Sequence, residues 1–312
     1  MTNKKIAVLL IGFGGPTSMV EVRPFFQSVL QGAHIPQSRV DEVLHHYEVF
    51  NGVSPYNSTT YKQKESLEKW FKEKNIALPV LVGFLHTKPT FEDVFAELKR
   101  NGVEKVIGFV LSPFRCQTSF EKYLYHVNES KKITNAASIE IDTTGCFHSE
   151  PLFLKAQAEN VRIALKHFLA KDIEHTFFLF SAHSVPVRMS DESGYAKQFY
   201  EAASRIAEKL GLSNWDIAYQ SRSGNPSDPW LSPDVKEKVE GLDDTRFKNV
   251  MLIPVGFLCD NVEVLYDLDV DAKDTAETMG FKYFRASTVA DHPKFIEMMG
   301  MQVMDTLKAL KS

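Results

Sequence analysis

Two segments in different halves of the chain end an apolar run in a short turn and a proline, and they differ at one residue that could do chemistry. The first is GFGGP at 12–16, after the run Ile6–Ile11, and the second is FSAHSVP at 180–186. If the two halves are duplicates, Phe13 and His183 hold equivalent positions on either side of a cleft. Histidine titrates near neutral pH, whereas phenylalanine neither donates nor accepts a proton. This asymmetry suits a flat, apolar substrate that is handled chemically from one face.

Three carboxylates lie four residues apart in the segment GFLCDNVEVLYDLDVD at 256–271. They are Glu263, Asp267 and Asp271, which one helix would place along one side with a drift of about 40° per step. Like charges at this spacing destabilise a helix by about 0.2–0.5 kcal/mol per pair, so the row points to a function. Hard oxygen ligands leading to a histidine would bind a divalent metal weakly and pass it along.

For Glu263 and His183 the alternative to a chemical function is a purely structural role. Asp260 and Glu263 have the spacing of a capping box, and acidic side chains in a first turn also favour the helix dipole. This alternative explains Glu263 but not Asp271, which lies beyond the first two turns. For His183 the alternative is a histidine held by hydrogen bonds in a buried turn, but a place at the end of a strand in a cleft favours function.

The remaining polar segments are weaker signals. GFGGP is not a dinucleotide fingerprint, because GxGxxG would require glycine at position 17, which is Thr17. Tyr47 precedes a glycine turn, and His86 and Trp230 lie in loops after predicted strands. Ordinary loop architecture explains most of these features.

The elements that must position these residues alternate along the chain as apolar, strand-like runs and longer helical stretches. This alternation predicts βαβ units with parallel sheets, that is, an α/β fold of two Rossmann-like lobes with about four strands each. We expect the lobes at 1–147 and 148–312, with a ligand cleft at the carboxyl ends of the strands. The predicted strands are Ile6–Ile11, Val80–Leu85, Val106–Leu111, Ser138–Thr143, Thr176–Phe180, Asp216–Tyr219, Asn249–Val255 and Phe281–Phe284.

Composition excludes several classes of function. A net charge of −4 does not indicate a surface that binds nucleic acid. Cys116, Cys146 and Cys259 are scattered, which indicates neither a disulfide framework nor a thiolate metal centre and favours a reduced, cytoplasmic location. No run approaches the roughly 18 apolar residues that would span a bilayer, although contact with a membrane surface stays open. The oligomeric state is not predictable from these features.

Four segments together resemble the ferrochelatase family, and the resemblance runs nearly end to end. They are FSAHSVP at 180–186, YQSRSG at 219–224, PWLSPDV at 229–235 and GFLCDNVEVLYDLD at 256–269. The resemblance implies two Rossmann-like lobes that hold a porphyrin between them, and insertion of Fe²⁺ with release of two pyrrole protons. It implies that His183 and Glu263 are catalytic and that both contact the metal, together with Asp267 and Asp271. The expected porphyrin-binding residues are Phe13, Tyr47, Ser54, His86, Tyr123 and Trp230.

The chain departs from the family pattern at several positions. Cysteines that hold an iron–sulfur cluster in some members are absent, so we expect no cluster and no permanently bound cofactor, with Fe²⁺ acting as a substrate. Some members have tyrosine at Phe13, and Asp-His is frequent at Asp260-Asn261. Members that use coproporphyrin tend to have an arginine pair at Leu30-Gln31.

These departures favour protoporphyrin IX, with two propionates, over coproporphyrin III, with four. If coproporphyrin III is the substrate, the missing charge must come from other cations, namely Arg23, Lys88, Arg115 or Arg222. Two further alternatives are a chelatase for another tetrapyrrole or metal and a non-catalytic haem or porphyrin carrier. The acidic row favours an enzyme, because a carrier has no use for carboxylates that lead into an apolar cleft.

Overall fold

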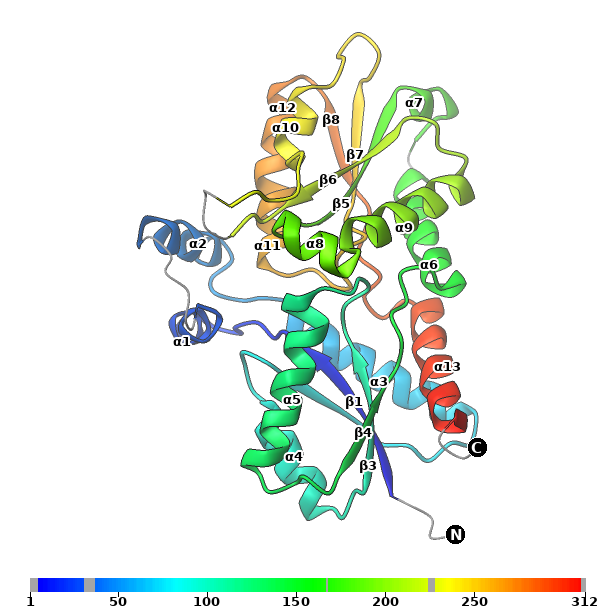
Figure 1. Ribbon diagram of the computed structural model, residues 1–312. Coiled ribbons are helices and arrows are strands. Elements are labelled where there is room, and N and C mark those ends of the chain that lie inside the picture. The colour runs from blue at the N-terminus through cyan, green and yellow to red at the C-terminus, as the bar shows by residue number, and fades with distance from the viewer. Residues whose placement is uncertain (1–4, 31–36, 167, 224–227, 310–312) are drawn as a thin grey trace.

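The chain folds into two lobes, each built on a parallel sheet of four strands. The computed structural model describes residues 5–30, 37–166, 168–223 and 228–309 (Figure 1). The first sheet has the order β2-β1-β3-β4 and the second has the order β6-β5-β7-β8. The strands are β1 (Ile6–Gly12), β2 (Val80–Phe84), β3 (Lys105–Val110), β4 (Glu140–Thr143), β5 (Thr176–His183), β6 (Trp215–Gln220), β7 (Asn249–Ile253) and β8 (Lys282–Arg285).

The two sheets repeat one topology, which confirms the predicted fold class and the duplication of the halves. β1 and β5 occupy the same inner position, each between the second and third strands of its own lobe. Phe13 directly follows β1, and His183 is the last residue of β5. The two residues therefore lie at the carboxyl ends of equivalent strands, as the repeated sequence pattern predicts.

Helices cover both faces of each sheet, which is why the strands read as unbroken apolar runs. In β1, Val8 and Leu10 pack on one side with the helices at 56–73 and 293–309, whereas Leu9 and Ile11 pack on the other with those at 91–100 and 122–133. The helices of the first lobe are α1 (Met19–Val29), α2 (Gln37–Val49), α3 (Tyr56–Glu73), α4 (Phe91–Arg100) and α5 (Lys122–Ile133). Later helices are α6 (Pro151–Leu165), α7 (Ala170–Glu174), α8 (Val187–Ser193), α9 (Tyr195–Leu210), α10 (Val235–Glu240), α11 (Val262–Tyr266), α12 (Lys273–Thr278) and α13 (Pro293–Ala309).

The last helix of the chain ties the lobes together. α13 returns to the first lobe and packs against α3 and α6 (Figure 1). The approach to α3 is close, since a Cβ on Gly300 would lie 2.4 Å from the indole of Trp70. The rings of Phe147, Phe153 and Phe295 meet at the same junction. A lobe boundary between residues 147 and 148 stays a prediction, and α13 lies against both sides of it.

Each lobe carries a π-helical turn after its third strand. The first turn, η1 (Gln117–Glu121), leads into α5, and the second, η2 (Asp267–Ala272), lies between α11 and α12. Such turns occur often at functional sites, because the extra residue redirects side chains. Among the described residues, no helix is long and apolar enough to cross a membrane.

Candidate active site

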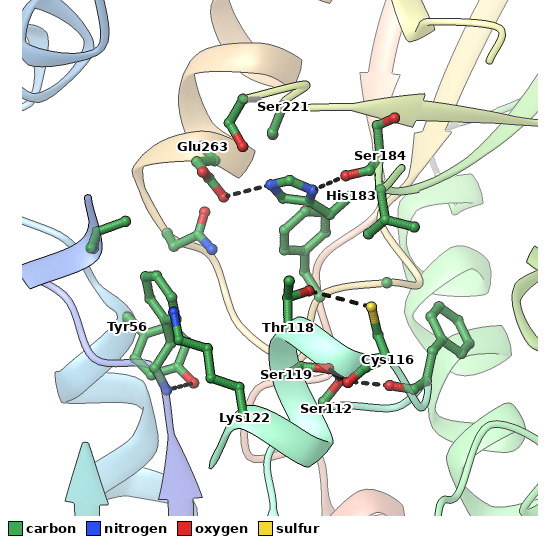
Figure 2. A pocket seen from close by; sticks show the side chains of 18 of the residues that line it. Tyr56, Ser112, Cys116, Thr118, Ser119, Lys122, His183, Ser184, Ser221 and Glu263 are labelled. Carbon is green, nitrogen blue, oxygen red and sulfur yellow. Dashed lines mark hydrogen bonds and ion pairs between the residues drawn. The ribbon is translucent and has the colours of Figure 1, made fainter. Parts of the chain in front are cut away.

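A cavity of about 430 Å³ lies between the two lobes at the carboxyl ends of the strands. The loop after β1, the segment 111–123 and the helices α1 and α2 line it from the first lobe. The end of β5, the loops after β6 and β7, and the start of α11 line it from the second lobe. Figure 2 shows His183 and Glu263 on one side of this cavity and Tyr56 and Lys122 on another. The size and the mostly apolar lining suit a large planar ligand.

His183 is held at the end of β5 by contacts on three sides. Its Nδ1 lies 2.5 Å from the carbonyl oxygen of Ser184, and a carbonyl can only accept, so Nδ1 carries the hydrogen (Figure 2). The hydroxyl of Tyr195 donates to the carbonyl oxygen of His183 over 3.0 Å. Gly256 closes over the same strand, since a Cβ there would lie 2.6 Å from the Cβ of Ala182. In the neutral ring, Nε2 is therefore the proton acceptor.

Glu263 is the partner of that acceptor. Its Oε2 lies 3.8 Å from Nε2 of His183, and both side chains are partly exposed to the cavity. Burial of the imidazole works to lower the pKa of His183, but the Glu263 carboxylate, the Ser184 carbonyl and Asp267 outweigh it and raise the pKa. The site therefore makes His183 a stronger base than an ordinary histidine.

Glu263 does not form the capping box that its spacing with Asp260 suggested. Asn261 is the N-cap of α11, and its side chain accepts from the Val264 amide over 2.8 Å. Asp260 instead binds Arg285, with Oδ1 3.1 Å from the guanidinium. Because Asn261 already satisfies the helix start, Glu263 is left to face His183.

The acidic row bends away from the single helix that the sequence predicted. Glu263 lies on α11, whereas Asp267 and Asp271 lie on the π-helical turn η2. Because a π turn holds more residues than an α turn, a step of four residues falls short of a full turn there, whereas in an α-helix it overshoots by about 40°. Asp267 lines the cavity and accepts from the hydroxyl of Ser221 and from Gln220. Asp271 does not line it and is paired with Lys236, with Nζ 3.0 Å from Oδ2.

The Asp267 carboxyl sits in an environment that favours its neutral form. Burial and the charge of Glu263 raise its pKa to about 7, although the hydrogen bond from Ser221 works in the opposite direction. A carboxyl with this pKa can both accept and give up a proton near neutral pH. Among the described residues, no three His, Cys, Asp or Glu side chains are grouped to hold a metal ion, so the four predicted metal contacts do not form one cage.

Arg285 fixes the segment that carries the acidic row. Its guanidinium contacts Asp269 on η2 at 2.6 and 2.8 Å and Asp260 before α11 at 3.1 and 3.2 Å. The Arg285 side chain is 14% exposed. These ion pairs join the segments on either side of α11 to β8, and α11 carries Glu263. The position of Glu263 therefore depends on a residue outside the cavity.

The predicted porphyrin-binding residues divide into three groups. Phe13, Tyr123 and Trp230 line the cavity, as expected. Tyr47 and Ser54 instead line a smaller cavity of about 70 Å³ beside it, which shares Phe13, Tyr56 and Glu263 with the main one.

His86 lines neither cavity. Its ring packs behind Phe13, with ring centroids 4.6 Å apart, and Nδ1 lies 2.8 Å from the Ser28 hydroxyl. Burial and the charge of Lys122 lower the pKa of His86 to about 4. His86 therefore packs against Phe13, which does line the cavity, and direct contact of His86 with the substrate stays a prediction.

Several residues that line the cavity were not predicted from the sequence. Apolar side chains of α1 and α2 cover part of the cavity, and Tyr56 accepts a hydrogen bond from the Phe13 amide over 3.0 Å. Lys122 lines the cavity, whereas none of the four cations suggested from the sequence, Arg23, Lys88, Arg115 and Arg222, does so. Lys122 lies one helical turn after the loop that follows β3, and this place near a strand end is the sequence feature that could have predicted its contact with the cavity. Gln31, the second residue of the predicted arginine-pair position, lies outside the described residues.

Comparison with solved structures concerns the fold. In structure, the chain is similar to SirB from Bacillus subtilis with Fe³⁺, with a TM-score of 0.61 and 12% identity over 97% of this chain and 95% of that one. SirB from Bacillus subtilis subspecies spizizenii, a sirohydrochlorin chelatase in complex with cobalt, gives a TM-score of 0.58 and 11% identity over 97% and 95%. At such identities the likeness establishes the fold alone, which is the two-lobed fold of chelatases.

Sequence comparison gives the particular family. The family model of ferrochelatase matches residues 5–307. The chain is 35% identical to a ferrochelatase of Rhodopirellula baltica over 303 residues, which cover 97% of this chain and 86% of the relative. It is 34% identical to a coproporphyrin III ferrochelatase of Nocardia farcinica over 297 residues, covering 93% and 84%. The chain belongs to the ferrochelatase family of enzymes, which insert iron into a porphyrin, and this confirms the resemblance drawn from the four motifs.

Proposed function

We propose that this enzyme inserts Fe²⁺ into protoporphyrin IX to form haem and releases two pyrrole protons. The observation that carries the proposal is the His183–Glu263 pair on the wall of a largely apolar cavity between the lobes, with 3.8 Å between Nε2 and Oε2. A planar porphyrin hides its nitrogens from an approaching metal. Holding it bent between the lobes exposes a nitrogen lone pair and moves the substrate towards the transition state.

His183 and Glu263 act on the reacting nitrogens. Nε2 of neutral His183 accepts one pyrrole proton, and the carboxylate of Glu263, 3.8 Å away, accepts the other. Glu263 is also the inner carboxylate for the incoming iron. Because the two groups interact, their titration belongs to the pair and not to either residue alone.

Asp267 and Asp271 provide the route between this pair and the outside. Asp267 lies within the cavity lining and Asp271 lies beyond it, so iron moving inwards meets Asp271 first. Lys236 forms an ion pair with Asp271, and an arriving cation would either displace the Lys236 ammonium group or bind the same carboxylate beside it. Oxygen ligands of this kind suit a divalent cation that is held briefly.

The apolar lining supports protoporphyrin IX as the substrate. Phe26 and Val29 of α1, Leu30 directly after it, and Val40 and Val43 of α2 line the cavity. Four propionates would need more cationic partners than the described lining offers. Coproporphyrin III is the second candidate, and the names of relatives such as that of Nocardia farcinica favour it.

Parallel anaerobic assays test the proposal. Purified protein is supplied with Fe²⁺ and either protoporphyrin IX or coproporphyrin III, and the metalloporphyrin is followed by absorption. We expect the higher kcat/KM with protoporphyrin IX. A clear preference for coproporphyrin III would overturn the choice of substrate. Binding of porphyrin with a shifted absorption band but no metal insertion would indicate a carrier, and faster insertion of another metal or into another tetrapyrrole would indicate a different chelatase.

Three further expectations belong to this proposal. No permanently bound cofactor and no iron–sulfur cluster are expected; the absorption spectrum of the purified protein checks the first, and iron and sulfide analysis checks the second. A cytoplasmic location follows from the cysteine usage, and cell fractionation checks it.

A further inference from the structure

Lys122 places an unpaired positive charge in the wall of the cavity. It is the first residue of α5, directly after η1, and its side chain lines the cavity on the side of Tyr56 (Figure 2). Among the described residues that line the cavity, it is the one lysine or arginine. No described side chain or carbonyl forms a hydrogen bond or an ion pair with its ammonium group.

The surroundings of Lys122 do not compensate this charge. The adjacent carboxylate, Glu121, is taken by Arg115, with Oε1 2.5 Å from Nε. Burial lowers the pKa of Lys122, and its charge adds to burial in lowering the pKa of both His86 and His126. A half-buried cation without a partner is unfavourable, so an anion in this part of the cavity would be stabilised.

The same wall offers hydroxyl groups, whereas another wall is apolar. Ser112, Thr118 and Ser119 line the cavity from the segment that ends in Lys122 (Figure 2). The side chains from α1 and α2 are apolar apart from His46. A porphyrin with carboxylates along one edge and apolar groups along the other therefore has a preferred orientation in this cavity.

We infer that Lys122 binds a propionate of the porphyrin through a charge-assisted hydrogen bond and so determines both the orientation of the macrocycle and the preference for carboxylated substrates. This inference rests on the proposed function and names a specificity residue for it. Lys122 takes no part in proton transfer, because it lies on a different side of the cavity from the His183–Glu263 pair (Figure 2). Its loss should therefore affect binding of the substrate more than the chemical step.

The experiment compares Lys122→Met, Lys122→Arg and the matched control Lys131→Met, which removes a charge from the far end of α5. Each variant is assayed with Fe²⁺ and either protoporphyrin IX or its dimethyl ester, in the same detergent. Lys122→Met should raise KM for the free acid about tenfold with kcat changed less than twofold, as expected for the loss of one hydrogen bond to a charged group. It should leave KM for the ester unchanged. Lys122→Arg should retain most of the affinity, and Lys131→Met should match the wild type.

Each other outcome counts against the inference. An equal rise in KM for acid and ester would show that Lys122 acts through packing, and an unchanged KM for the acid would show that the propionates lie elsewhere. A fall in kcat alone would assign Lys122 to the chemical step. If the wild type inserts iron into neither porphyrin, the proposed function fails first, and fluorescence titration with free-base protoporphyrin IX still tests whether Lys122→Met weakens binding of the acid.

Discussion

Nε2 of His183 lies 3.8 Å from Oε2 of Glu263, although the two residues come from different strand ends of the second lobe. β5 carries the imidazole, and the loop after β7 leads into the helix that carries the carboxylate. Since β5 and β7 are neighbours in the sheet, their carboxyl ends bring the two side chains to one edge of the cavity. The equivalent strand of the first lobe, β1, ends at Gly12 and is followed by Phe13, so an imidazole stands at this strand end in the second lobe and an apolar ring in the first.

Glu263→Gln should lower turnover at least a hundredfold, whereas Asp271→Asn should lower it less than tenfold. The reason is that Glu263 faces His183 inside the cavity, whereas Asp271 lies outside it and is paired with Lys236. Steady-state iron insertion by both variants checks the order. Equal losses would place the acidic row in a purely electrostatic role.

The pH dependence of Glu263→Gln gives a second readout. The pKa of His183 is raised in the wild type, partly by Glu263, so activity should increase with pH through a value above the ordinary histidine pKa of about 6.5. Removing the carboxylate should move this acidic limb to lower pH. A limb that stays in place would show that another group titrates.

Asp267→Asn should stabilise the protein, and more at pH 8 than at pH 5. The pKa of Asp267 is raised to about 7 by burial, above its unfolded value of about 3.9, so the folded state binds more protons than the unfolded state between these values. Stability from this group is therefore present at low pH and lost as pH rises towards 7. Thermal unfolding of both proteins at several pH values measures the difference, and a pH-independent difference would contradict the assignment.

Arg285→Met should destabilise the protein by about 2 kcal/mol, because it leaves Asp260 and Asp269 without their cation in a partly buried site. Arg285→Lys should restore only part of this loss, since an ammonium group cannot contact both carboxylates in the same forked way. Denaturant unfolding measures the free energies. Full stability in Arg285→Met would show that η2 is held by its packing alone.

The haem product should show no tyrosinate ligand, because Phe13 has no oxygen and lines the cavity from the lobe that does not carry His183. The absorption and resonance Raman spectra of the product complex test this, with Phe13→Tyr as the comparison that should introduce such a ligand. A tyrosinate signature in the wild type would point instead to Tyr123, which lines the same cavity.

The sequence predicted the scaffold well because buried parallel strands have a distinctive apolar pattern. All eight strands lie where their runs indicated, and β5 extends three residues further than Phe180, to His183. The π-helical turn at Asp267 was not predictable, since its residues satisfy the α-helical spacing equally well. The helix start was misread because Asp260 and Asn261 are both good caps, and the pairing of Asp260 with Arg285 decides between them.

The outer wall of the cavity was the least predictable part. The pairing of Lys236 with Asp271 and the placement of Lys122 depend on contacts between elements far apart in the chain. His86 has a suitable residue type and follows a strand end, but the Phe13 ring against which it packs lines the cavity and His86 does not. Local sequence does not show which of two neighbouring side chains lines a cavity.

The most direct test of the account is metal insertion by His183→Ala. The anaerobic assay is run with Fe²⁺ and protoporphyrin IX, beside circular dichroism and a fluorescence titration that measures porphyrin binding. We expect a loss of turnover of about 10²–10⁴-fold or more, with the fold and porphyrin affinity largely retained, because Nε2 of His183 accepts a pyrrole proton. A folded variant that binds porphyrin and keeps more than a few per cent of wild-type turnover would contradict it.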